Sequence, residues 1–236
     1  MIINRDLLEK YAREIEVELD NNAISRFEVY AGELIGTNRK YNLTAITDPD
    51  EIVVKHFIDS LIILKYFDLD YKTKIIDIGS GAGFPGIPLL IAKDNQLKVT
   101  FLDSVRKKLL FIENALRSTG MEGELLCMRA EDAGKKEEYR EKFDVATARA
   151  VASMSALCEY CLPFVKLGGY FIALKGSGDE LSSAENAIKT LGGEIESNVS
   201  YKLPNGDSRT MVIIKKISQT PTEYPRKAKK ITTKPL

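Results

Sequence analysis

Short β-branched segments alternate with helical segments between residues 74 and 190, and this alternation limits the fold more than any other feature. Each strand candidate is almost continuously apolar, which is typical of strands buried on both faces of a parallel sheet. The expected strands cover residues 74–78, 98–102, 124–128, 144–147 and 170–174, and the expected helices cover 85–92, 105–117, 151–160 and 179–190. This order predicts an α/β chain with a Rossmann-like, doubly wound and mostly parallel sheet.

A hairpin is expected after the last of these helices. Strand-like residues cover 194–201 and 209–217, and the sequence Asn205-Gly206-Asp207 between them is a strong turn signal. We expect this C-terminal pair to add antiparallel strands to one edge of the sheet.

A segment whose apolar residues have helical spacing precedes the expected sheet, and a basic tail follows it. Apolar residues recur three and four positions apart up to Gly36, where the second helix is expected to end, and a third helix fits 52–66. Residues 215–236 contain seven basic residues and one acidic residue. We therefore expect an N-terminal helical extension over 1–70, an α/β domain over 71–219 and a basic C-terminal tail over 220–236. The tail is rich in Pro and Lys, so we expect it to be irregular.

Composition and charge exclude several classes of protein. The chain has 34 basic and 34 acidic residues, so it is not a general polycation. Its apolar stretches are much shorter than the roughly 20 residues that span a bilayer, so we expect no membrane contact and a cytoplasmic location. Cys158 and Cys161 form a Cys-x-x-Cys pair, but His56 is the single histidine and lies far away in sequence. We expect no metal, packing of the two cysteines in the core, and a monomer.

The most specific local signal is the turn after the first strand, Asp77-Ile78-Gly79-Ser80-Gly81-Ala82-Gly83-Phe84-Pro85-Gly86. A dinucleotide-binding turn requires glycine where Phe84 stands, and a P-loop requires a following Gly-Lys-Ser/Thr. The pattern Gly-x-Gly-x-Gly preceded by an acid resembles the first motif of class I methyltransferases, whose cofactor is S-adenosyl-L-methionine. We expect the cofactor at Asp77, Gly79, Gly81 and Gly83. A purely structural glycine turn is the alternative.

The ends of the next three strands carry side chains that suit the rest of this cofactor. Asp103 ends the second strand, where a carboxylate can accept hydrogen bonds from both ribose hydroxyls; capping of the following helix is the alternative. The third strand leads to Ala130 and Glu131, where a backbone N–H and an acid can meet an adenine edge. The fourth strand leads to Arg149. Ligands of doubly wound folds bind at the carboxyl ends of the strands, so we expect these residues to converge.

With these motifs, the chain resembles the bacterial ribosomal RNA small subunit methyltransferase G family, also called glucose-inhibited division protein B, over nearly its whole length. The resemblance rests on the glycine turn and on residues 41–46, 56–61, 103–104, 147–150, 173–176 and 224–227. It implies transfer of a methyl group from S-adenosylmethionine to N7 of one guanine near the decoding region of 16S rRNA, in the small ribosomal subunit. It also implies cofactor contacts at Gly79, Phe84, Ala130, Glu131 and Arg149. The tail departs from the family pattern at residues 228–233, where turn residues are replaced.

The chemistry of the side chains agrees with methylation at a ring nitrogen. Guanine N7 has an exposed lone pair and needs no deprotonation, so positioning can account for much of the rate. No Pro-Cys pair is present for carbon-5 methylation of cytosine, and residues 147–150 lack the Asn/Asp-Pro-Pro-aromatic sequence that is common in amine methylation. We interpret Arg149 as a catalytic residue that orients the cofactor or a substrate phosphate. A structural ion pair is the alternative.

Candidate RNA contacts lie after the fifth strand and in the tail. Lys175, Arg226 and Lys227 could each bind a phosphate, and a solvated tail is the alternative. His56 could line the RNA site or have a packing or capping role, so it is assigned no catalytic role. Three other functions remain open: a class I methyltransferase acting on a small molecule or a protein, an NAD-dependent oxidoreductase, and a non-catalytic ribosome-associated binding protein.

Overall fold

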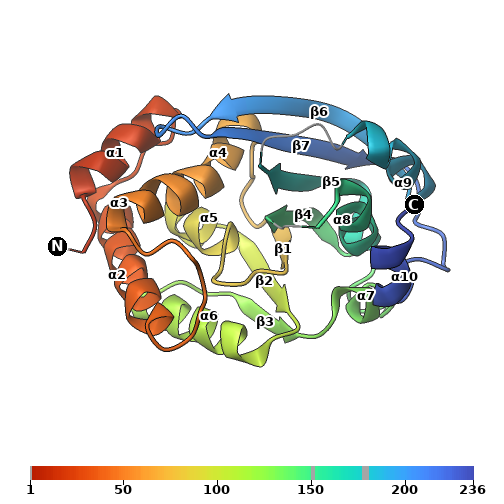
Figure 1. The fold of residues 1–236 in the computed structure, drawn as a ribbon, viewed down its shortest axis with the longest axis horizontal. Coiled ribbons are helices and arrows are strands. Elements are labelled where there is room, and N and C mark those ends of the chain that lie inside the picture. The colour runs from red at the N-terminus through yellow and green to blue at the C-terminus, as the bar shows by residue number, and fades with distance from the viewer. Residues whose placement is uncertain (1, 150–151, 177–180) are drawn as a thin grey trace.

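A seven-stranded mixed sheet forms the centre of the protein in the computed structural model, which describes residues 2–149, 152–176 and 181–236 (Figure 1). The strands are β1 Lys74–Ile78, β2 Lys98–Asp103, β3 Glu124–Cys127, β4 Phe143–Arg149, β5 Val165–Lys175, β6 Gly193–Lys202 and β7 Ser208–Lys216. Their order across the sheet is β3-β2-β1-β4-β5-β7-β6. The strands from β3 to β5 are parallel to one another, and β7 is antiparallel to both β5 and β6. The expected fold class and the hairpin at the sheet edge are confirmed.

Helices cover both faces of the sheet. In chain order they are α1 Arg5–Glu14, α2 Asn21–Asn38, α3 Pro49–Ile52, the π-helix η1 Val53–Ile58, α4 Asp59–Tyr66, α5 Gly86–Ala92, α6 Arg106–Thr119, α7 Ala130–Ala133, α8 Met154–Cys161, the 3-10 helices η2 Leu162–Phe164 and η3 Ser182–Ala184, α9 Glu185–Thr190 and α10 Ala228–Thr233. Within the described ranges, no helix combines the length and the apolar character that a membrane span requires.

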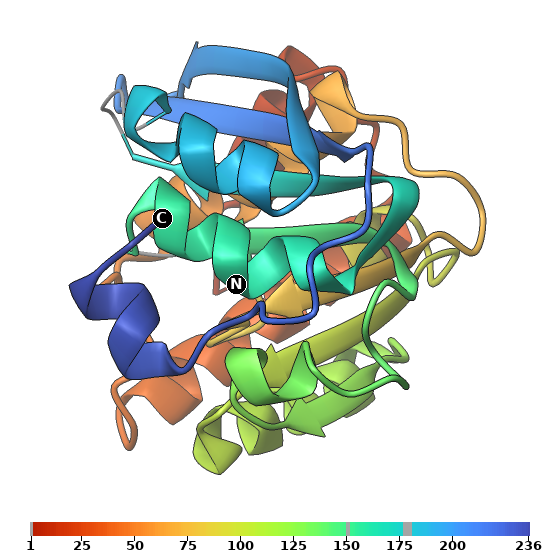
Figure 2. The ribbon, with the colours of Figure 1, turned by 90° about the vertical axis from the view of Figure 1, so that its right-hand side faces the viewer.

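The two helical layers form two separate cores, because successive residues of a strand face opposite sides of the sheet. Ile75 of β1 belongs to the core that contains the N-terminal helices, α5 and α6. Ile76, the next residue, belongs to the core that contains α8 and α9. Figure 2 shows α8 and α9 in front of the sheet and the N-terminal helices behind it.

The N-terminal helices share their core with the sheet. Phe27 of α2 and Phe57 of η1 have ring centroids 4.8 Å apart, and both side chains are fully buried. The helix expected over 52–66 forms as η1 followed by α4. The expected end of α2 at Gly36 is wrong by two residues, because a glycine weakens a helix without terminating it. The division of the chain at residue 70 stays a prediction.

Parts of three predictions lie outside the described residues. These are Ala150 of the fourth strand motif and the expected helix starts at residues 151 and 179. The remaining parts of the two helices are present as α8 and as η3 with α9. Cys158 and Cys161 are both fully buried on α8, as the packing interpretation expects.

The tail is ordered by long-range contacts, so the expectation of an irregular segment is wrong for residues 228–233, which form α10. The Arg140 guanidinium donates to the carbonyl oxygens of Thr220 at 2.7 Å, Pro221 at 3.1 Å and Tyr224 at 2.8 Å. Ile231 of α10 is fully buried. Figures 1 and 2 show α10 beside α7 and α8, so the end of the chain packs on the helical layer that covers this face of the sheet.

Candidate functional site

The glycines of the turn after β1 are required by the backbone conformation and, at Gly83, by close packing. Gly79, Gly81 and Gly83 have φ values of +67°, +59° and +90°, which favour glycine. A Cβ atom on Gly83 would lie 2.5 Å from Cδ1 of Ile87, so this residue allows close packing of the turn on α5. A Cβ atom on Gly79 would meet no protein atom within 4 Å, so the turn is open to solvent there. Gly79 therefore leaves room for a ligand.

Asp77 supports the turn from below. Its Oδ2 accepts a hydrogen bond from the backbone N–H of Gly86 at 3.1 Å, and its Oδ1 accepts one from the Thr147 hydroxyl at 3.4 Å. The side chain is fully buried, and this burial raises the pKa of Asp77 from 3.8 to about 7. Asp77 therefore connects the start of α5 to Thr147, near the carboxyl end of β4. Its carboxyl does not face the pocket described below.

The raised pKa of Asp77 predicts a pH-dependent stability. The unfolded chain ionises Asp77 near pH 4, whereas the folded chain does so near pH 7, so this group stabilises the fold below pH 4 and that contribution is lost between pH 4 and pH 7. Asp77→Asn cannot ionise. Its free energy of unfolding should match that of the wild type near pH 4 and exceed it at pH 8. A pKa shift of one unit corresponds to about 1.4 kcal/mol. At pH 8 the free energy of unfolding of the variant should therefore exceed that of the wild type by at least this amount. Urea unfolding across this range measures it, and a gap that does not vary with pH contradicts the prediction.

A pocket of about 310 Å³ lies at the carboxyl ends of β1, β2 and β3. Its lining includes Gly79, Asp103, Ala130, Glu131, Tyr160 and Ala228. A larger hollow of about 640 Å³ lies at the amino ends of the strands, beside Lys74 and Lys98. Doubly wound folds bind ligands at the carboxyl ends of their strands, so we assign the smaller pocket as the candidate site.

Asp103 presents a carboxylate to this pocket and also orders its walls. Its Oδ2 accepts a hydrogen bond from Gly81 N–H at 3.0 Å, and its Oδ1 accepts one from Val105 N–H at 2.8 Å. Lys108 Nζ lies 3.6 Å from Oδ2. The N-cap residue of α6 is Val105, so Asp103 is not the cap of that helix. A carboxylate has about four acceptor positions, which leaves capacity for ligand hydroxyls.

A second polar cluster lies beside the turn, around Arg149 at the end of β4. Its guanidinium donates to the carbonyl oxygen of Lys55 at 3.1 Å and to Nδ1 of His56 at 3.1 Å, and it lies 4.5 Å from the ring centroid of Phe84. The imidazole of His56 stacks on the same ring, with centroids 4.4 Å apart. Phe84 is therefore held between the π-helix and β4, and its ring does not line the pocket.

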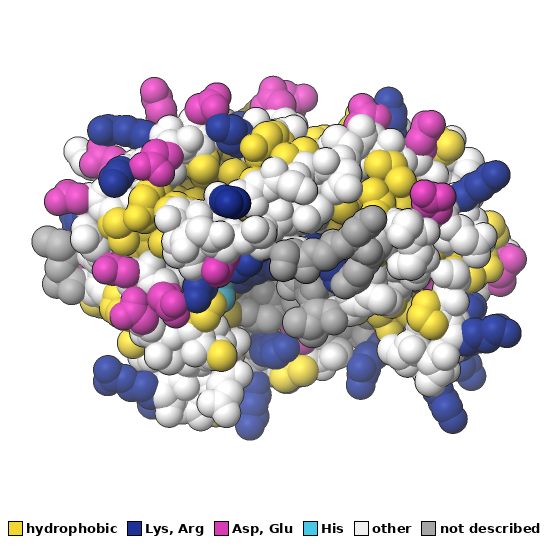
Figure 3. Space-filling view, turned by 45° about the horizontal axis from the view of Figure 1, so that its top comes forward, with side chains coloured by type: hydrophobic (Ala, Val, Ile, Leu, Met, Phe, Trp, Pro, Cys, Tyr) yellow, Lys and Arg dark blue, Asp and Glu magenta, His cyan; other side chains and the backbone are white. Residues whose placement is uncertain are grey.

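The protonation state of His56 follows from its neighbours. Arginine has only donors, so Nδ1 of His56 accepts and Nε2 carries the proton, which is donated to the Thr44 hydroxyl oxygen at 2.8 Å. Burial, together with the nearby Arg149 charge, lowers the pKa of His56 from 6.5 to about 3. His56 is neutral at physiological pH. A small part of it reaches the surface and is visible in cyan in Figure 3.

Asp59 connects this cluster to the hairpin. Its Oδ2 lies 3.6 Å from Nη1 of Arg149, and its Oδ1 accepts a hydrogen bond from the Tyr201 hydroxyl at 2.9 Å. Arg209 Nε lies 3.8 Å from Oδ1. Burial raises the pKa of Asp59, and the two arginines oppose this change. The cluster therefore joins α4, β4, β6 and β7 next to the glycine turn.

Comparison with known proteins decides the family. The family model described as rRNA small subunit methyltransferase G matches residues 23–211, which is most of the chain. The chain belongs to this family. It is 44% identical to the ribosomal RNA small subunit methyltransferase G of Alkaliphilus oremlandii and 47% identical to that of a Thermoanaerobacter species, over 98% of both chains in each case. The resemblance found in the sequence motifs is confirmed.

Solved structures show the same fold at low sequence identity. A SAM-dependent O-methyltransferase from Thermotoga maritima superposes with a TM-score of 0.53 and 15% identity, covering 80% of this chain and 72% of that one. At this identity the likeness establishes the fold alone. It agrees with the predicted class I methyltransferase architecture.

In this methyltransferase G family member, the predicted cofactor residues fall into three groups. Gly79, Asp103, Ala130 and Glu131 line the pocket. Gly81 and Gly83 shape the glycine turn and Asp77 supports it from below, whereas Phe84 and Arg149 lie in the adjacent polar cluster. Some lining residues were missed in the sequence, among them Tyr160 of α8 and Ala228 of the tail. Neither lies in a motif that indicated a pocket.

The predicted RNA contacts lie in different surroundings. Lys175 donates to the carbonyl oxygen of Ala152 at 2.6 Å, at the rim of the pocket. Arg226 donates from Nη2 to Oε2 of Glu159 at 2.6 Å, and Glu159 is fully buried. Lys227 is exposed immediately before α10. The structure thus turns Arg226 inward while Lys227 faces solvent, and their binding to RNA stays a prediction.

Proposed function

We propose that this chain transfers a methyl group from S-adenosyl-L-methionine to N7 of a guanine in 16S rRNA, near the decoding region of the small ribosomal subunit. The observation that carries the proposal is the pocket formed by Gly79 and Asp103 at the switch point of the sheet, in a chain of the methyltransferase G family. A ribosomal substrate would place the protein in the cytoplasm. The family name favours rRNA over a small molecule or a protein as the acceptor.

The residues of the pocket fit the proposed cofactor. Gly79 leaves open space, and the buried Asp103 carboxylate has acceptor capacity for ribose hydroxyls. Among the described residues, the Ser80 hydroxyl is the one buried side-chain polar atom without a hydrogen-bond partner, and it lies in the same turn. A buried polar group normally has a partner, so Ser80 is expected to gain one when the cofactor binds. The bound cofactor supplies a methyl group on a sulfonium.

Methylation at N7 agrees with the polar cluster beside the pocket. N7 needs no general base, and the neutral His56 already uses its acceptor nitrogen to bind Arg149. The cluster can hold the glycine turn rigid through Phe84, and rigid positioning is what an in-line methyl transfer requires.

A matched pair of glycine variants tests the cofactor site. Gly79 and Gly168 both have positive φ, and an added Cβ meets no atom within 4 Å at either position. Each change to alanine should cost about 1–2 kcal/mol of stability through backbone strain. Only Gly79→Ala should also weaken S-adenosylmethionine binding, by about tenfold or more, because its methyl group enters the pocket. Calorimetric titration measures this, and equal affinities in the two variants contradict the assignment.

The function itself is tested by methyl transfer from radiolabelled S-adenosylmethionine to 16S rRNA and to 30S particles. Reduction followed by aniline cleavage then locates N7-methylguanosine in the RNA. We expect label in 16S rRNA and a single cleavage site near the decoding region. Label in a protein of the 30S particles would support a protein acceptor, and label on another atom of the RNA would contradict the N7 assignment. Cofactor binding without transfer to any acceptor would support a non-catalytic protein.

A further inference from the structure

Exposed basic residues lie on several segments next to the candidate pocket, and the site described above assigns them no role. They come from the end of α2, the start of α6, the residue before α7, and α10. We call this set the basic rim, and it consists of Arg39, Lys40, Arg106, Lys107, Arg129, Lys229 and Lys230. Lysines and arginines also dominate the charged side chains along the lower edge of Figure 3.

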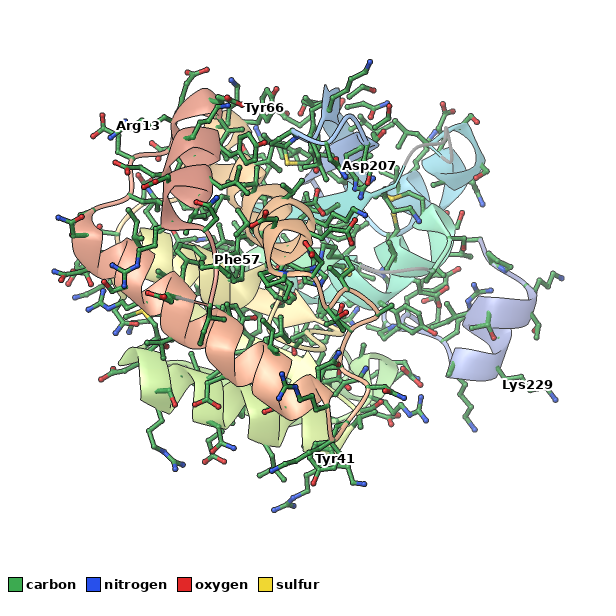
Figure 4. All side chains as sticks on the ribbon, turned by 60° about the vertical axis from the view of Figure 1, so that its left-hand side comes forward. Arg13, Tyr41, Phe57, Tyr66, Asp207 and Lys229 are labelled. Carbon is green, nitrogen blue, oxygen red and sulfur yellow. The ribbon has the colours of Figure 1, made fainter. Side chains whose placement is uncertain are left out.

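Two observations place these segments near the same pocket. The pocket lining includes Lys108 of α6, Arg129 and Ala228, so α6, the segment before α7, and α10 meet there. Lys107 Nζ lies 5.5 Å from the ring centroid of Tyr41, which brings the loop after α2 to the start of α6. Figure 4 shows Tyr41 and Lys229 on the same lower side of the molecule, both directed outward.

The charges of the basic rim are not explained by internal contacts. In the part of the chain that the structure describes, none of its members forms an ion pair. The first turn of α6 contains Arg106 and Lys107 and no acidic residue, although the helix dipole favours acids there. These cations therefore slightly destabilise the free protein, and a bound anion would offset that cost.

Tyr41 adds an aromatic surface to the basic rim. Tyr41 is 49% exposed. RNA-binding proteins stack unpaired bases on exposed aromatic rings, and nearby cations bind the phosphates. A duplex offers no free base face, so the combination suits a single-stranded segment.

We propose that the basic rim binds the phosphates of single-stranded rRNA flanking the target guanine, with Tyr41 as a stacking platform for a neighbouring base. The inference rests on the proposed function and adds the loop after α2, the start of α6 and Arg129 to the tail as RNA-binding elements. The loop after α2 and the start of α6 hold the strand on one side of the pocket, and α10 holds it on the other. The target base is thereby directed to the pocket mouth.

Two tyrosine variants test the stacking platform. Tyr71 is also exposed, and Lys72 Nζ lies 4.9 Å from its ring centroid, but this pair lies at the amino ends of the strands. Tyr41→Ala should weaken binding to 16S rRNA transcribed in vitro by roughly tenfold, whereas Tyr71→Ala should leave it unchanged. Both variants should bind S-adenosylmethionine as the wild type does, since neither side chain lines the pocket at Gly79.

Two charge variants test the phosphate contacts. The slope of log affinity against log salt concentration measures how many phosphates the protein contacts. In Arg106→Ala/Lys107→Ala we expect the magnitude of this slope to fall by roughly 1 to 2, which corresponds to two lost phosphate contacts. Lys98→Ala/Lys142→Ala, two exposed lysines at the other end of the sheet, should leave the slope unchanged.

The outcomes separate this inference from the proposed function. If the wild type binds and methylates 16S rRNA but Tyr41→Ala and Arg106→Ala/Lys107→Ala behave like their controls, the inference is wrong and the proposed function stands. If the wild type neither binds nor methylates the RNA, the proposed function fails, and the inference fails with it. If Tyr41→Ala changes the oligomeric state and leaves RNA binding intact, the surface belongs to a second copy of the chain, which also overturns the inference.

Discussion

Replacing Arg149 by alanine is expected to lower kcat for methyl transfer by about 100-fold, because a misplacement of about 1 Å near the reacting atoms can have that effect. The Arg149 guanidinium contacts the Phe84 ring and binds the Lys55 carbonyl and His56, so it sets the distance between the π-helix and the glycine turn. It does not line the pocket, so the dissociation constant of S-adenosylmethionine should change by only a few fold. We therefore propose Arg149 as a positioning residue for the transfer step.

The same substitution should also destabilise the fold. It leaves the buried Asp59 carboxylate with Arg209 at 3.8 Å as its remaining ion-pair partner among the described residues. Breaking a buried pair costs about 3–5 kcal/mol, so activity must be measured at a temperature where the variant is folded. Arg149→Lys keeps the charge but loses the planar fork, and it should restore much of the stability and little of kcat. Wild-type kcat in folded Arg149→Ala would reject the positioning role.

Replacing Arg226 by alanine is expected to lower the free energy of unfolding by about 3–5 kcal/mol. Glu159 is fully buried and accepts three hydrogen bonds from the Arg226 side chain, from Nε at 2.8 and 3.0 Å and from Nη2 at 2.6 Å. Among the described residues, the substitution leaves that carboxylate with the backbone N–H of residue 226 as its one hydrogen-bond donor. The end of the tail after residue 226, including Ala228 at the pocket, should then loosen, and S-adenosylmethionine affinity should fall with it.

Two controls isolate the ion pair between Arg226 and Glu159. Lys227 is exposed at the next position, so Lys227→Ala should leave stability within about 0.5 kcal/mol of the wild type. Arg226→Ala/Glu159→Gln removes the uncompensated charge and should be more stable than Arg226→Ala alone, which a double-mutant cycle from urea unfolding quantifies. An Arg226→Ala protein as stable as Lys227→Ala would show that the tail is held by other contacts.

The sheet and the glycine turn were predictable because their signals are local. Most of the parallel strands contain a short apolar run, and the turn carries its glycines within five residues, from Gly79 to Gly83. The spacing of Asp103 after the turn follows from the βαβ unit, so its place in the pocket could also be foreseen.

The tail and the polar cluster were not predictable from local patterns. Arg140 binds carbonyl groups about 80 residues later in the chain, and Glu159 binds Arg226 at a separation of 67 residues. A Pro- and Lys-rich segment looks solvated when such partners are unknown. Tyr201 likewise had no signal that would connect it to Asp59, 142 residues earlier. Motif residues such as Phe84 were found, but whether a motif side chain faces the ligand or the core depends on packing that spacing does not encode.

A crystal structure of the protein soaked with S-adenosylhomocysteine tests the central claim most directly. The account predicts the ribose hydroxyls at the Asp103 carboxylate, the adenine beside Ala130, and the Ser80 hydroxyl bonded to the ligand. A ligand found in the larger hollow beside Lys74 and Lys98, or a pocket at Gly79 that stays empty at saturating concentration, would contradict it.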